Sequence, residues 1–124
     1  MRENIDSKVW TGYFKEFNAR NIARPTRLEH FDELGVYEEE HGLPFAGIAF
    51  DTSSDNAPSI QIMFGARGER SRHLTHVIRN VLGITPKSGL DGRDEALVIV
   101  SGEGFRDMLR FEREALAAAA ANAH

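Results

Sequence analysis

The chain has 124 residues, a formal net charge of −4 and no cysteine. This length is typical of one domain, and the lack of cysteine excludes disulfides, thiolate metal ligands and cysteine nucleophiles. No run approaches the roughly 20 apolar residues of a membrane helix, and the first ten residues lack the apolar segment of a signal peptide. We therefore expect one cytoplasmic domain over residues 1–124, with no membrane association. The negative charge argues against nucleic acid as a partner.

The first expected element is a helix that begins near Asp6 or Ser7, whose side chains can accept from free backbone amides. Apolar residues then recur at helical spacing, and the helix should end between Asn18 and Pro25. The apolar residues are Val9, Trp10, Tyr13, Phe14 and Phe17. We expect this aromatic stripe to pack on the rest of the domain. The alternative is a partner-binding helix, since exposed aromatic patches often mark interfaces.

From Thr26 onward the pattern predicts strands. The expected strands are 26–33, 35–42, 45–51 after an interruption at Pro44, and 59–65. In the third strand, Phe45, Gly47 and Ala49 should share one face, with Ala46, Ile48 and Phe50 on the other. In the fourth strand, Ile60, Ile62 and Phe64 should face inward. The runs EALVIVS and FRDMLRFE, joined by GEG, predict a hairpin.

This order of elements predicts an α+β fold, in which an N-terminal amphipathic helix packs on an antiparallel sheet of about six strands. A small open barrel is one form that such a sheet can take. We expect the ordered core to span residues 6–113. The alanine-rich segment 114–124 should form a helical or frayed tail.

The segment HLTHVIRNVLG, residues 73–83, is compatible with two structures. As a helix it places Leu74, Val77 and Ile78 on one side and ends at Gly83. As a strand it places Leu74, His76 and Ile78 on one face and His73 on the other. The two histidines share a face on the helix and point apart on the strand.

Five stretches in a fixed order resemble a bacterial family of small single-domain proteins known as a domain of unknown function. They are VWTGYFKEFN, LPFAGIAFD, IQIMFG, HLTHVI and DEALVIVSGEGFRDMLRF. The resemblance covers roughly residues 8–112. It implies no activity and no catalytic residue, but it favours a strand over residues 73–78.

On the strand interpretation, His76 points toward the core and needs a polar partner. In FRDMLRF, Asp107 falls on the same face as Phe105, Leu109 and Phe111. A His76–Asp107 pair would satisfy both groups and could act in acid–base chemistry. The alternatives are a buried neutral histidine and an Asp107 that is solvated at a bulge or rim. Arg72 would complete the lining of such a ligand site.

Three charged stretches carry weaker expectations. The loop ARGERSR offers Arg67 and Arg70 for an anion, although it lacks the phosphate-loop ending. The run EEEH at 38–41 is typical of a solvated strand edge, because one face supplies too few ligands for a metal. LDGRDE at 90–95 indicates a hairpin turn instead of a calcium loop.

No catalytic residue, metal ligand or cofactor is assigned by these patterns. We expect a non-catalytic interaction or self-association module, with a protein partner or a second copy of the chain. The alternative is a small-ligand binder or enzyme with its site at a barrel mouth around His76 and Asp107. Whether the protein is an enzyme stays open at this point.

Overall fold

A computed structural model describes residues 5–52, 58–65 and 73–112. The chain forms one helix and seven strands in this part, which confirms the α+β class and exceeds the expected six strands by one. The expected tail at 114–124 lies outside the described residues. The elements are η1 (Ser7–Val9), α1 (Trp10–Asn21), β1 (Pro25–Asp32), β2 (Gly35–Asp51), β3 (Ser59–Phe64), β4 (Leu74–Ile78), β5 (Val81–Ser88), β6 (Asp94–Ser101), η2 (Gly102–Gly104) and β7 (Arg106–Phe111).

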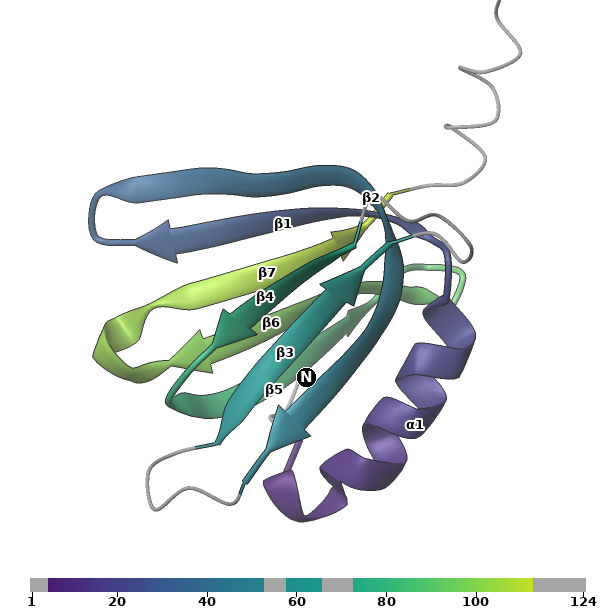
Figure 1. The fold of residues 1–124 in the computed structure, drawn as a ribbon, viewed down its shortest axis with the longest axis horizontal. Helices are drawn as coiled ribbons and strands as arrows, with labels where there is room; N and C mark the ends of the chain where they lie inside the picture. The colour runs from purple at the N-terminus through teal and green to yellow at the C-terminus, as the bar shows by residue number, and fades with distance from the viewer. Residues whose placement is uncertain (1–4, 53–57, 66–72, 113–124) are drawn as a thin grey trace, which may run out of the picture.

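All strands belong to one antiparallel sheet with the order β4-β3-β2-β1-β7-β6-β5. The long strand β2 joins two halves, because its first part pairs with β1 and its last part with β3. It bends between them, so that β4 and β3 lie across the interior from β7 and β6 (Figure 1). β4 and β5, at the two ends of the order, are not paired with each other, and the sheet is open instead of a closed barrel.

The partner of β2 changes from β1 to β3 directly after Pro44, where the sequence predicted a break between two strands. That prediction is wrong: the strand continues through Pro44, which lies opposite Pro25. Proline has no backbone N–H to donate to a neighbouring strand, but neighbouring amides make the hydrogen bonds that hold the strand at this point. The Phe45 amide donates to the Arg24 carbonyl at 2.9 Å, and the Gly65 amide donates to the Pro44 carbonyl at 2.9 Å.

The strict alternation predicted for residues 45–51 is also wrong. Phe45 and Ile48 are both buried, because a register shift between Phe45 and Gly47 inserts an extra residue. Gly47 takes a φ of 154° at this bulge. The Asn18 side chain of α1 accepts from the Ile48 amide at 2.9 Å and donates to its carbonyl at 3.0 Å. The irregular strand therefore supplies a docking point for the helix.

The helix packs its aromatic stripe into the core, as expected. Trp10, Phe14 and Phe17 are buried, and the Phe17 ring lies 5.7 Å from those of Phe45 and Phe111. The alternative of a partner-binding aromatic stripe is wrong, because these rings are covered. Asp6 accepts from the Lys8 amide at 3.0 Å, as its position before the helix predicted. None of the helices described is long and apolar enough to cross a membrane.

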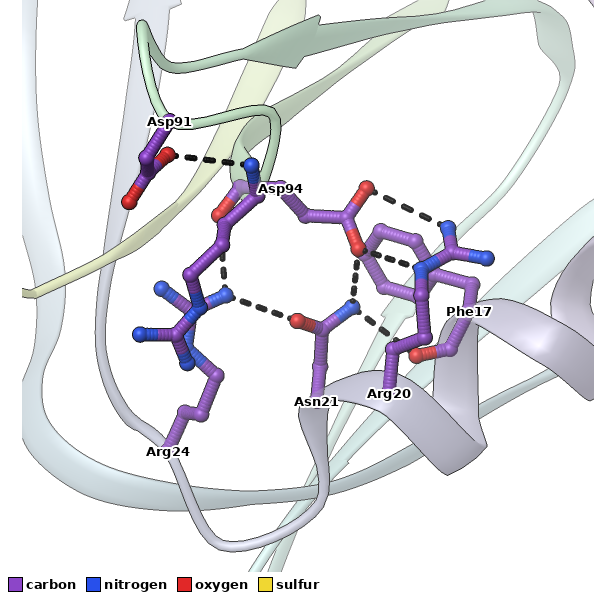
Figure 2. A network of polar contacts seen from close by, with 7 residues as sticks. Phe17, Arg20, Asn21, Arg24, Asp91 and Asp94 are labelled. Carbon is purple, nitrogen blue, oxygen red and sulfur yellow. Dashed lines mark hydrogen bonds and ion pairs between the residues drawn. The ribbon is translucent and has the colours of Figure 1, made fainter.

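A polar network ties the end of α1 to the start of β6 (Figure 2). The Asp94 carboxylate accepts from Arg20 at 2.8 and 3.2 Å and from Asn21 at 2.8 Å. Arg24 donates to the Asn21 side chain at 2.7 Å and to the Asp94 carbonyl at 2.8 Å. Burial alone would raise the pKa of Asp94, but the bonds from Arg20 and Asn21 outweigh it and hold the pKa below its usual value. This cluster fastens the helix and has a structural role.

Candidate functional site

The segment 73–82 forms strands, as the resemblance favoured. β4 ends at Ile78, and β5 begins at Val81 after a turn in which Asn80 has a φ of 55°. His76 lies opposite Ile62 in the register, so it faces the interior, although 27% of its side chain stays exposed. His73 precedes the strand and is exposed. The two histidines therefore do not form a common site.

Asp107 is the buried centre of a cluster at the interior of the bent sheet. It is 3% exposed, so the expectation of a solvated carboxylate at a bulge or rim is wrong. Its Oδ1 lies 3.0 Å from His30 Nδ1 and 3.9 Å from His76 Nε2. The structure thus brings His76 and Asp107 together, within the 6 Å or so that one-water contact requires. His30 of β1 is the nearer partner.

Glu39 of β2 is the fourth member of this cluster, and a bulge directs it inward. Leu28 pairs with Glu40, whereas the next residue, Glu29, pairs with Glu38. Glu39 is therefore the extra residue, and bulges of this kind re-aim side chains beside functional sites. Its Oε2 lies 3.2 Å from His76 Nε2. The solvated-edge interpretation of EEEH misses this carboxylate.

His30 is held on three sides. Its Nδ1 is bonded to Asp107, its Nε2 lies 3.9 Å from Asp32 Oδ2, and its ring lies 5.4 Å from that of Phe105. The bond to Asp107 raises the pKa of His30 above its usual value by more than burial lowers it, and the charges of Glu39 and Asp32 act in the same direction. The imidazole therefore sits in a negative field.

We call His30, Glu39, His76 and Asp107 the histidine–carboxylate cluster. Each member comes from a different strand: β1, β2, β4 and β7 respectively. In the described part of the chain, the carboxylates of Glu39 and Asp107 form ion pairs with histidine alone. With no lysine or arginine partner among the residues that the structure describes, the cluster keeps a net negative charge when its imidazoles are neutral. It can accept a proton or a cation.

The other predicted site residues are three arginines in the stretch after β3. Arg67, Arg70 and Arg72 lie outside the described residues, so both the anion loop and the third lining residue stay predictions. Residues 90–93 of LDGRDE lie in the turn between β5 and β6, as expected, and the last two residues begin β6. In the turn the Asp91 carboxylate accepts from the Arg93 amide at 3.0 Å. The structural role of Asp94 in that stretch was not foreseen.

Sequence reasoning also missed His30 and Glu39. Strand periodicity could have indicated that His30 faces inward, because His30 lies on the same face of β1 as Thr26 and Leu28. Both of those residues are buried. No local signal marks Glu39, since the bulge that redirects it depends on how β2 pairs with β1.

Comparisons with protein-family models, with curated proteins and with solved structures found no match for this chain. The resemblance to a domain of unknown function, based on the five sequence stretches, stays a prediction. Inference about function therefore depends on the geometry of the cluster.

Proposed function

We propose that the protein binds a small, positively charged ligand in the histidine–carboxylate cluster. The observation that carries this proposal is the buried Asp107 carboxylate, on which the imidazoles of His30 and His76 converge at 3.0 and 3.9 Å. A buried charge is costly unless it is compensated. Here the partners are imidazoles, which can exchange a proton for another cation.

The charge balance favours a cation over an anion. Glu39, Asp107 and the adjacent Asp32 supply three carboxylates around two imidazoles. Glu39 and His76 are partly exposed, at 32% and 27% of their side chains, so the cluster is reachable from solvent. Because water is partly excluded from the site, its carboxylates attract a cation more strongly than exposed carboxylates do.

Thermal unfolding in the presence of candidate cations tests this proposal. The panel contains putrescine, guanidinium and the chlorides of Mg²⁺, Mn²⁺, Co²⁺ and Zn²⁺, with sodium phosphate as the anionic control. We expect at least one cation to stabilise the native chain, by about 2.7 kcal/mol at 100 times its Kd. The anion should not stabilise it.

Two variants decide whether such a stabilisation comes from the cluster. Asp107→Asn removes the central charge with little change of shape, and Glu39→Gln does so at the exposed side, where folding is less at risk. Both should lose the cation effect, while Glu40→Gln, one residue further along β2, should keep it. If no cation stabilises the native chain, or if all three variants respond equally, the proposal is wrong.

Self-association is a second candidate function, and a different surface supports it. On the face of the sheet that points away from the core, a hollow extends over β1, β5, β6 and β7. Its apolar lining is Phe31, Val98, Val100 and Met108, and its polar lining is Thr85, Lys87 and Arg106. Apolar surface of this kind is typical of interfaces, and a two-fold dimer would place the same hollow of two chains against each other.

Sedimentation velocity over a range of concentrations tests this second proposal. A stable dimer buries about 800 Å² on each partner, and we expect Val98→Glu to abolish it by placing a charge in the hollow. Val77→Glu is the matched control, because Val77 is 42% exposed on β4, away from the hollow. A native chain that is monomeric at all concentrations would contradict self-association.

A further inference from the structure

The four side chains of the histidine–carboxylate cluster carry the donor atoms of a metal centre. Imidazole nitrogen and carboxylate oxygen are the ligands that zinc and its first-row neighbours take in proteins that use no thiolate. The chain has no cysteine, so these are the donors available to it. Ca²⁺ and Mg²⁺ are less suited, because they prefer oxygen ligands alone.

The distances between the donors are close to those that a single ion imposes. Four ligands about 2.0–2.1 Å from a tetrahedral zinc ion lie about 3.3–3.4 Å from one another. His30 Nδ1 and Asp107 Oδ1 are 3.0 Å apart, His76 Nε2 and Glu39 Oε2 are 3.2 Å apart, and His76 Nε2 and Asp107 Oδ1 are 3.9 Å apart.

The wider spacing in the cluster is also within reach of side-chain rotation. Ligand atoms of His30, Glu39 and Asp107 all lie within 4.8 Å of one another. For these three residues, contraction to a tetrahedral edge requires movements of roughly 1.5 Å or less. His76 joins them through its contacts with Glu39 at 3.2 Å and Asp107 at 3.9 Å. Glu39 is 32% exposed and His76 is 27% exposed, so these two can move toward Asp107, which is fixed by burial.

The surroundings of His30 place a carboxylate on the side of the ring that faces away from the cluster, at an ion-pair distance that is longer than a hydrogen bond. A metal-bound histidine usually donates its other ring nitrogen to a carboxylate, which fixes the tautomer and the ring. With His30 Nδ1 directed at the cluster, its Nε2 faces Asp32 Oδ2 at 3.9 Å. The Phe105 ring, 5.4 Å from the imidazole, restricts its rotation.

We propose that the histidine–carboxylate cluster is a site for one divalent first-row transition metal ion, with His30 Nδ1, His76 Nε2, Glu39 and Asp107 as its ligands and Asp32 orienting His30. This inference rests on the proposed function, because it names the chemical class of the cation. The ion draws its ligands from four strands. His30, Glu39 and Asp107 come from the half of the sheet in which β2 pairs with β1, and His76 comes from β4 in the other half, so the ion would join the two halves across the interior.

Titration of the full chain with the metal alone tests this site. The protein is purified without a polyhistidine tag, treated with EDTA and dialysed. Isothermal titration with ZnCl₂ should give one equivalent, and CoCl₂ should give the visible absorption of a Co²⁺ centre with nitrogen and oxygen ligands. MgCl₂ should bind far more weakly than either.

Matched variants locate the ion. Asp107→Asn, His76→Gln and Glu39→Gln should each weaken Zn²⁺ binding by at least about 100-fold, and Asp32→Asn by about 10-fold, the lower end for an orienting partner. His73→Gln and Glu40→Gln are the controls for His76 and Glu39. They carry the same chemical change three residues from His76 and one residue from Glu39, and they should keep the native affinity. Circular dichroism confirms that each variant is folded.

The outcomes separate this inference from the proposed function. No stoichiometric binding of Zn²⁺ or Co²⁺, or equal losses in His73→Gln and His76→Gln, overturns the metal site. If putrescine or guanidinium alone stabilises the native chain and Asp107→Asn abolishes that effect, the cation-binding proposal stands and the metal site is wrong. If no cation acts, both are wrong.

Discussion

Replacing Asp94 by asparagine should weaken the attachment of α1 to the sheet. The carboxylate accepts three hydrogen bonds, two from Arg20 and one from Asn21, and its side chain is 11% exposed. Hydrogen bonds to charged groups contribute about 1.5–3 kcal/mol when desolvated. The Arg20 pair contributes less, about 0.5–1 kcal/mol, because the Arg20 side chain is 49% exposed.

We therefore expect Asp94→Asn to lower the free energy of unfolding by about 2–3 kcal/mol, which corresponds to roughly 6–12 °C in Tm for a chain of this size. Arg20→Ala should cost only about 0.5–1 kcal/mol. Urea unfolding followed by the fluorescence of the single tryptophan, Trp10, which is 2% exposed, measures both. The m-value should not change.

Asp91→Asn is the matched control for this prediction. Asp91 lies three residues before Asp94 and is exposed, and its carboxylate accepts a local bond from the Arg93 amide. Its replacement should change stability by less than about 0.5 kcal/mol. If Asp94→Asn costs no more than Asp91→Asn, the network of Figure 2 does not hold the helix, and the reasoning is refuted.

Three further predictions concern the site and the core. The folded pKa of His30 is raised, so its pairing with Asp107 contributes fully to stability below the unfolded pKa of about 6.5. This contribution is lost as pH rises through the higher folded pKa. Urea unfolding should therefore show that the stability difference between the native chain and His30→Gln shrinks from about pH 5.5 to about pH 9. Phe17→Ala should cost about 3–5 kcal/mol by the same assay, since Phe17 is 0% exposed among aromatic rings; a cost below 1.5 kcal/mol would contradict the packing. Gly47→Ala should cost more than about 1 kcal/mol, because a φ of 154° strains any residue with a Cβ; an unchanged Tm would contradict it.

The pH dependence of stability expected for the Asp94 network is opposite to the one expected for His30. Because the folded pKa of Asp94 is below its usual value, its contribution is present above an unfolded pKa of about 3.9 and is lost as pH falls through the folded value. The native chain and Asp94→Asn should therefore converge in stability as pH falls through the folded pKa of Asp94. This measurement separates the contribution of the Asp94 charge to stability from the contribution of the side chain's shape.

The sequence could predict the features that depend on neighbouring residues. The spacing of Trp10, Phe14 and Phe17 follows one helical face, and the alternation of Ile60, Ile62 and Phe64 follows one strand face, so both sets were expected in the core and are buried there. Local periodicity determines which face of an element is apolar. The alternation along residues 105–111 likewise placed Asp107 on a buried face.

The features that could not be predicted depend on pairing between distant strands. β2 continues through Pro44 because neighbouring amides supply the ladder bonds, and the bulges at Ala46 and Glu39 arise from register against β3 and β1. The cluster has the same origin. Asp107 meets His30 through the pairing of β7 with β1, and meets His76 only because the sheet bends.

The most direct test of the proposed metal site is the NMR signal of the imidazole nitrogens in uniformly ¹⁵N-labelled protein, recorded before and after one equivalent of Zn²⁺. Long-range ¹H–¹⁵N spectra distinguish Nδ1 from Nε2 in each ring. We predict that His30 Nδ1 and His76 Nε2 shift together to metal-bound values at pH 7.5, while His73 does not change. Unchanged signals of His30 and His76, or a shift confined to His73, would contradict the site.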